Sequence, residues 1–142
     1  MTNQLTHKLQ KIQNSCIRFT FGLRKYDRIT NFRISKNILS MQNRRLLHCL
    51  TLMFKIVKKI APVYLCDKIT YHNSLHNYNT RNKNDILTPF ARTRYRTLSF
   101  FIEISKQFNI ISQVLCISDL SLYAFKIKCK KYLTEKETLS LF

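Results

Sequence analysis

Turn-forming residues are scarce in this sequence, which has one Gly and two Pro among 142 residues. Few tight turns can be built from them, which argues against a β-sandwich and favours helices joined by polar connections. The hydrophobic content of 45% is too high for a disordered chain, and the length suits one domain with a modest core. We therefore expect a mainly α fold, a small helical domain of about four to five helices.

Acidic residues are also scarce: 7 Asp and Glu stand against 25 Lys and Arg, which gives a net charge of +18. Such an excess repels itself unless a polyanion neutralises it. The expected partner is therefore RNA or DNA, bound with low specificity. Two alternatives stay open: an anionic membrane surface, and a basic surface that only keeps the protein soluble.

Long apolar runs are absent. No stretch approaches about 18 uncharged apolar residues, so we expect no transmembrane segment. The first residues lack the apolar run of a secretion signal. The five cysteines are an odd number without paired spacing, which indicates free thiols in a reducing compartment. We therefore expect an intracellular protein, nuclear or cytoplasmic and not secreted.

Apolar residues at helical spacing are clearest in residues 41–61. There they form one stripe, which predicts a core-facing helix with Ser40 as its N-cap and Pro62 as its stop. The stripe consists of Leu46, Leu47, Leu50, Met53, Phe54, Val57 and Ile60.

A narrower seam near the N-terminus predicts a helix that ends at Gly22. Its members are Leu5, Leu9, Ile12, Cys16 and Phe19. Because this period is complete so soon after Met1, we expect the chain to belong to something longer.

Shorter helices are expected from an N-cap at Thr30 to about Ile38 and just after Pro62, and longer ones over residues 100–111 and 122–133. Residues 71–99 have no helical period and predict an extended basic arm. A short β-hairpin between residues 86–87 and 95–101 stays open. The expected plan is one domain, 1–142, in which residues 1–70 and 100–134 are helical, residues 71–99 form the arm and residues 135–142 form a frayed tail.

Basic residues that alternate with aromatic ones suit single-stranded nucleic acid, because bases stack on rings while phosphates meet cations. The arm carries this pattern, and its alternative is a solvated loop whose aromatics pack on the core. A second basic set lies on the central helix, where an ordinary exposed face is the alternative. A third lies near the C-terminus, where a helix that contacts phosphates or a nuclear-localisation patch is expected. The predicted binding residues are Arg81, Lys83, Arg92, Arg94, Tyr95 and Arg96 with Tyr78 and Phe90; Arg44, Arg45, Lys55, Lys58 and Lys59; and Lys126, Lys128, Lys130 and Lys131.

Residues for catalysis or metal binding are sparse. The sequence has no adjacent acidic pair. Cys49, Cys66, His72 and His76 have the ligand types of zinc but lack a paired C-x2-4-C spacing. His48 and Cys49 are neighbours and would point about 100° apart on a helix. We expect no enzyme activity, no metal and no cofactor.

Five blocks follow one another along the chain: LQKIQNSCIRFTFGL (9–23) with YDRIT, RRLLHCLTLMFKIVKKIAPVYL (44–65), HNYNTR (76–81), TRYRTLSFFIEISKQFN (93–109) and SLYAFKIKCKKYL (121–133). Taken in this order, they resemble the segment beyond the polymerase thumb in jockey-like non-LTR (LINE) retrotransposon reverse transcriptases. One departure is visible: Phe108-Asn109 stands where the family has Trp-Asn. Phe keeps an apolar plug there but loses the indole N–H donor.

The resemblance implies a C-terminal fragment of an RNA-directed DNA polymerase. Two-metal phosphoryl transfer needs converging carboxylates, and the palm segment that would carry them is not in this sequence. The expected role is non-catalytic binding of nucleic acid. The alternative is a packing module for the missing thumb, whose partner would be the polymerase region of related elements.

Overall fold

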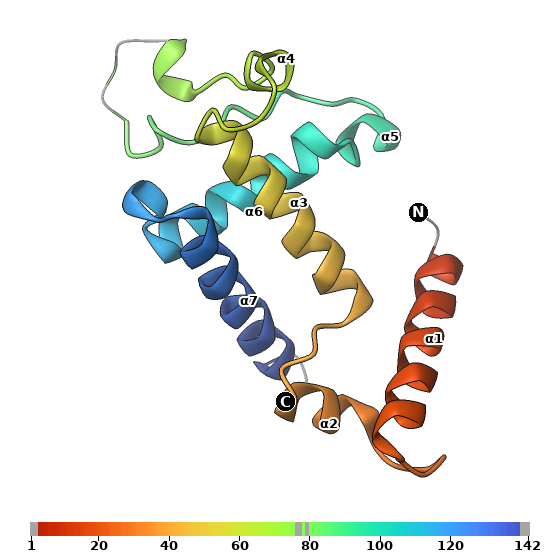
Figure 1. Cartoon of the computed structure of the whole chain (residues 1–142). Helices are drawn as coiled ribbons and strands as arrows, with labels where there is room; N and C mark the ends of the chain where they lie inside the picture. The colour runs from red at the N-terminus through yellow and green to blue at the C-terminus, as the bar shows by residue number, and fades with distance from the viewer. Residues whose placement is uncertain (1–2, 76–77, 79, 140–142) are drawn as a thin grey trace. The chain divides into compact units, whose positions relative to one another are not determined.

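The computed structural model describes residues 3–75, 78 and 80–139, and over these residues the chain is mainly helical (Figure 1). Within them no strand forms, and Tyr71 and Ile86 make an isolated antiparallel bridge. The mainly α class is therefore confirmed, with more helices than the four to five expected. The elements are α1 (Asn3–Phe21), α2 (Ile29–Ser35), α3 (Met41–Val57), α4 (Val63–Cys66), η1 (His72–Ser74), α5 (Arg94–Thr97), α6 (Phe100–Leu115), η2 (Ile117–Asp119) and α7 (Leu122–Leu139).

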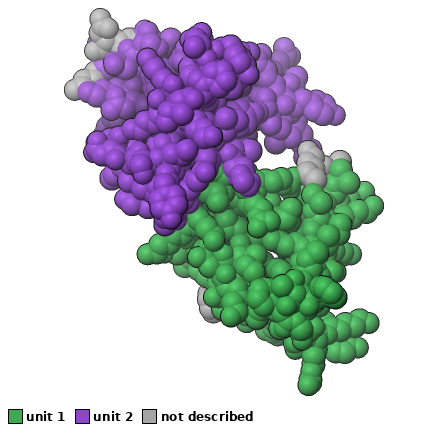
Figure 2. All heavy atoms as spheres, viewed as in Figure 1, with its two compact units in different colours: residues 1–47, 130–142 green, residues 48–129 purple. Residues whose placement is uncertain are grey.

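The chain groups into two compact units (Figure 2). Unit 1 consists of residues 1–47 and 130–142, and unit 2 of residues 48–129. Helices α3 and α7 each contribute residues to both units. Each unit is described separately below.

Unit 2 has an aromatic and aliphatic core supplied by α3, α6 and α7. The rings of Phe54 and Phe125 stack with centroids 4.4 Å apart, and Phe108 lies 6.2 Å from Phe125. Burial of such side chains contributes about 1.5–3 kcal/mol each. The buried apolar residues of these three helices in unit 2 are Leu50, Met53, Phe54, Ile56, Ile102, Ile104, Phe108, Ile111, Phe125 and Cys129.

Helix α3 ends earlier than its apolar spacing predicts. Lys59 adopts a left-handed conformation (φ +56°), and the Ile60 N–H donates to the Lys55 carbonyl at 2.8 Å. This is the Schellman arrangement that terminates helices. The prediction that Ile60 belongs to the core stripe is therefore wrong, and its side chain is 62% exposed. Pro62 lies beyond the stop and does not cause it.

Other helix ends agree with the sequence only to some extent. Gly22 has φ +62° and follows α1, as predicted. The Ser40 hydroxyl accepts from the Asn43 N–H at 3.3 Å, so the N-cap of α3 is confirmed. The N-cap predicted at Thr30 is wrong, because α2 already begins at Ile29.

Two further expectations are corrected. Residues 95–101 form no strand, since α5 covers Arg94–Thr97 and α6 begins at Phe100. The tail is not frayed over residues 135–139, because α7 continues to Leu139. Residues 140–142 lie outside the described residues.

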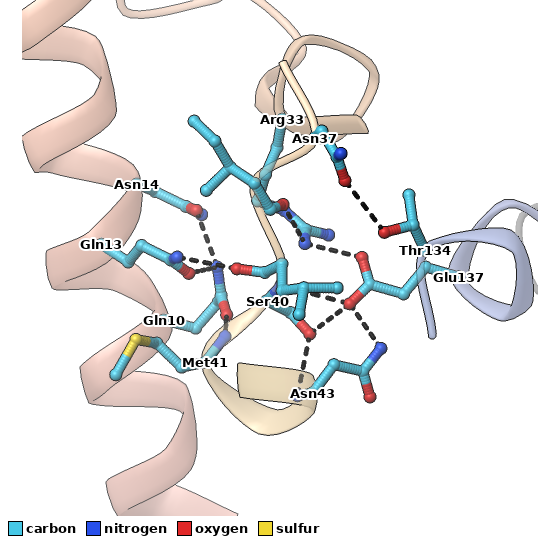
Figure 3. Close-up of polar contacts among 12 residues, drawn as sticks. Gln10, Gln13, Asn14, Arg33, Asn37, Ser40, Met41, Asn43, Thr134 and Glu137 are labelled. Carbon is cyan, nitrogen blue, oxygen red and sulfur yellow. Dashed lines mark hydrogen bonds and ion pairs between the residues drawn. The ribbon is translucent and has the colours of Figure 1, made fainter. Parts of the chain in front are cut away.

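The seam predicted on α1 is not its buried face. Phe19 is 92% exposed and Ile12 59% exposed, although α1 itself forms as expected. Two polar residues face the rest of unit 1 instead (Figure 3). Gln13 Nε2 donates to the Leu39 carbonyl at 2.9 Å, and Gln10 Oε1 accepts from the Met41 N–H at 3.0 Å.

A carboxylate near the C-terminal end of α7 joins the elements of unit 1 (Figure 3). Glu137 accepts from Arg33 Nη1 at 2.6 Å and from Asn43 Nδ2 at 2.6 Å. It also accepts from the backbone N–H and the hydroxyl of Ser40. The Arg33 and Glu137 side chains are only 9% and 13% exposed. One side chain therefore connects α7 with α2 and with the N-terminus of α3.

Burial alone would raise the pKa of Glu137, but hydrogen bonds from Ser40 and Arg33 and the charge of Arg33 lower it below its ordinary value. A carboxylate with a lowered folded pKa stabilises the fold above its ordinary pKa. That contribution is lost as the pH falls through the lowered value.

We expect Glu137→Gln to lower the free energy of unfolding by about 3 kcal/mol near neutral pH, because the buried Arg33 loses its charged partner. The difference from wild type shrinks as the pH falls from the ordinary pKa of 4.5 through the lowered pKa of folded Glu137, because protonation removes the same charge that the substitution removes. Urea unfolding, followed by circular dichroism at several pH values, measures the loss of stability and its dependence on pH.

Glu135→Gln is the matched control for this experiment. Glu135 lies on the same helix and pairs with Lys131 at 3.9 Å, but the two side chains are 60% and 79% exposed. The same change there should cost less than about 0.5 kcal/mol. Equal effects of the two variants would contradict a special role for Glu137.

Candidate nucleic-acid interface

Backbone hydrogen bonds fold the first half of the basic arm back on itself. The Leu87 N–H donates to the Thr70 carbonyl at 2.8 Å, and the Asn73 N–H donates to the Lys83 carbonyl at 3.0 Å. Tyr71 and Ile86 bridge between these bonds. The hairpin partner of Ile86 is thus residue 71 and not the segment 95–101.

Asn109 on α6 clamps the arm at Ile86. The Ile86 N–H donates to Asn109 Oδ1 at 3.0 Å, and Asn109 Nδ2 donates to the Ile86 carbonyl at 2.9 Å. Ile86 itself is 3% exposed, so both of its backbone groups depend on this amide. Sequence reasoning did not assign Asn109 a role, although it stands in the Phe108-Asn109 pair of the family resemblance.

Aromatic side chains of the arm project into solvent. Tyr78 is 78% exposed, Phe90 is 88% exposed and Tyr95 is 92% exposed. At these exposures the three rings do not pack on the core, as they would in the alternative of a solvated loop with core-packed aromatics. An exposed ring offers a face on which a base can stack.

Basic residues alternate with these rings along the chain. Arg81, Arg92, Arg94 and Arg96 are exposed, and Lys83 is half-buried. On α5, Arg94 and Arg96 flank Tyr95, and the Thr93 hydroxyl caps this turn by accepting from the Arg96 N–H at 3.4 Å. The predicted arm residues thus share one unit and are open to a ligand.

The basic set predicted on the central helix is divided. Arg44 is exposed in unit 1, whereas Arg45 is half-buried and donates to the Thr6 hydroxyl at 3.4 Å. In unit 2, Lys55 is half-buried and Lys59 is exposed. Lys58 donates to the Ser118 carbonyl and lies 5.8 Å from the Phe54 ring centroid. These five residues therefore do not form one uniform exposed face.

The C-terminal basic set is spread around α7. Residues two apart on a helix point to nearly opposite sides, so Lys126 and Lys128 diverge. Lys126, Lys128 and Lys131 are exposed and Lys130 is half-buried, with Lys131 paired to Glu135. The first two belong to unit 2 and the last two to unit 1.

Two titratable side chains of unit 2, Cys129 and Tyr71, have raised pKa values. Burial raises the pKa of the Cys129 thiol to about 11, which keeps it protonated and unreactive. Burial, and then the charge of Cys66, raises the pKa of Tyr71.

Of the possible zinc ligands, His76 lies outside the described residues. Among those described, no three His, Cys, Asp or Glu side chains lie close enough together to hold a metal ion.

Comparison with models of protein families, with curated proteins and with solved structures found no match to this chain. No helix within the described ranges of the chain is long and apolar enough to cross a membrane.

We expect Asn109→Ala to lower the free energy of unfolding by about 2–3 kcal/mol, because two buried backbone groups of Ile86 lose their partner. Release of the arm should also speed trypsin cleavage after its arginines. Gln107→Ala is the control, since the Gln107 amide donates within α6, to Glu103 at 3.4 Å. A cleavage rate unchanged by Asn109→Ala would show that the clamp does not hold the arm.

Proposed function

We propose that this chain is a non-catalytic C-terminal fragment of a non-LTR retrotransposon RNA-directed DNA polymerase, and that it binds single-stranded RNA or DNA through residues 78–96. The observation that carries the binding is the exposure of Tyr78, Phe90 and Tyr95 among exposed arginines. A single strand has both unstacked bases and closely spaced phosphates, so it satisfies rings and cations together. A duplex would satisfy mainly the cations.

The charge balance of unit 2 supports the same proposal. Unit 2 has 12 Lys and Arg against 4 Asp and Glu. Of those acidic residues only Asp85 belongs to the arm. The unit therefore presents a positive field that attracts a polyanion and releases its counterions on binding.

The ordered blocks of the resemblance support the origin of the chain, and the lack of an adjacent acidic pair supports a role without polymerase chemistry. All five cysteines are free thiols, as in proteins of reducing compartments. The proposal therefore places the chain inside the cell, in the nucleus or cytoplasm. Its second partner would be the polymerase region of related elements.

We expect the joint change of Arg92, Arg94 and Arg96 to Ala to weaken binding of a single-stranded RNA. The slope of log K against log salt should become shallower by about 2, because each phosphate contact contributes about 0.7 on single strands. Fluorescence anisotropy over a salt series, with duplex DNA as a second probe, measures this.

The matched control changes Lys8, Lys11 and Arg24 to Ala, which removes the same charge from exposed positions of unit 1. Tyr95→Ala should weaken RNA binding by about 1–3 kcal/mol with an unchanged salt slope, because a stacked ring makes no ion pair. Equal losses of RNA affinity in the two triple variants would show that binding depends on net charge alone.

A different observation favours the packing module as a second candidate. The apolar seam of α1 faces outward, with Leu5 48%, Ile12 59% and Phe19 92% exposed. Soluble monomers seldom leave a row of large apolar side chains uncovered. In the packing role, this row docks on the polymerase thumb.

If the seam is a docking face, the isolated chain should self-associate through it. Sedimentation at increasing concentration would then give a mass above the 17.0 kDa of one chain. Joint change of Leu5, Ile12 and Phe19 to Gln should restore the monomer, whereas the same change of Tyr78, Phe90 and Tyr95 should not. A wild-type chain that stays monomeric would count against this candidate.

A further inference from the structure

Unit 2 contains a cavity of about 540 Å³ beside the anchored half of the arm. Phe54 of α3 and Phe108 of α6, both buried in the core, form its apolar floor, and the half-buried Tyr71 is the ring with accessible surface. Cavities of this size with apolar walls and a few polar groups are typical small-molecule sites. The volume is ample for a planar ring system.

Polar groups of opposite character line the same cavity. Asp85 is half-buried, and its Oδ2 accepts from Gln113 Nε2 at 3.2 Å. A carboxylate has about four acceptor positions, so it can take a further donor from a ligand. Lys58, which also lines the cavity, is exposed and carries a positive charge. The site therefore combines aromatic walls, an acceptor and a cation.

The wall that carries Asp85 is held in place. Asn109 fixes the next residue, Ile86, by two hydrogen bonds, and the His72 N–H donates to the Asp85 carbonyl at 3.2 Å. Held backbone on both sides of Asp85 limits how far its carboxylate can move. A second cavity of about 450 Å³ shares Tyr71 and Asn84 with the first and is also lined by Lys83.

We infer that the larger cavity binds one unstacked nucleobase bearing an exocyclic amino group. The base would lie on the apolar floor beside Tyr71, its amino group would donate to Asp85, and its phosphate would meet Lys58. An amino group is the natural donor to a carboxylate, as cytosine N4 is to Asp or Glu. Uracil has a carbonyl oxygen in the place of that amino group, and the carboxylate would repel it.

This inference rests on the proposed function in one respect: the base would belong to the strand that the arm binds. Residues 84–86 line the cavity and continue directly toward Arg92. A free nucleotide offers the same chemistry, so the experiment includes both sources.

The test compares oligocytidine with oligouridine of equal length by fluorescence anisotropy. The wild-type chain should prefer oligocytidine about tenfold, the scale of a hydrogen bond to a charged group. Asp85→Asn should abolish the preference, because its amide can turn a donor toward uracil. A ratio of two affinities is used because the lost negative charge strengthens binding of both strands alike.

Two more variants separate the cavity from general effects. Asp119→Asn makes the same charge change at an exposed residue of unit 2 and should keep the preference. Ser112→Phe places a ring in the cavity and should lose the preference, while the salt slope falls by no more than about 0.7, the share of the one phosphate contact at Lys58. Circular dichroism confirms that each variant is folded.

The outcomes are distinct. A wild-type chain that binds both strands equally, or a preference that survives Asp85→Asn, overturns the inference and leaves the proposed function standing. If neither strand binds, the proposed function fails. The cavity is then tested by itself, by comparing the binding of cytidine monophosphate with that of uridine monophosphate. A preference for cytidine monophosphate that Asp85→Asn removes supports a free-nucleotide site, and equal or absent binding of the two overturns the inference.

Discussion

The ion pair between Arg33 and Glu137 is the interaction on which the architecture of unit 1 depends. Both side chains are almost fully buried, and desolvating two charges is costly unless hydrogen bonds satisfy them. The Ser40 backbone and hydroxyl and the Asn43 amide supply those bonds. The same hydroxyl caps α3, so the start of that helix and the docking of α7 use a shared set of atoms. Loss of either charge would leave the other buried and uncompensated.

Unit 2 is organised differently, because an apolar core holds it and polar groups only fix its surface. Stacked Phe54 and Phe125 join α3 to α7, and Asn109 then holds the arm against α6. Phe90 and Tyr95 of the arm are 88% and 92% exposed and lie outside this core. Their exposure, with exposed arginines beside them in the sequence, is the observation on which the proposed binding of a single strand rests.

Particular residues show how far sequence reasoning reached. The stripe through Leu50, Met53 and Phe54 is buried as predicted, because α3 is long enough for its period to be unambiguous. The seam of α1 is equally regular but faces outward, since Gln10 and Gln13 make the contacts with the rest of unit 1. The end of the chain looked like a polar tail, but Glu137 has a buried partner 104 residues away. Of the predicted arm residues, each basic side chain could be named from the sequence, whereas the cavity wall at Asp85 could not.

The sequence by itself determined the properties that depend on neighbours along the chain. These are the mainly helical class, the cap at Ser40, the stop at Gly22 and the large positive charge. The tertiary structure alone decided which helix face is covered, where α3 stops relative to its stripe, and which carboxylate is buried. The physical reason is that spacing specifies which side chains share a face, while burial of that face depends on a surface supplied by residues far away in the sequence.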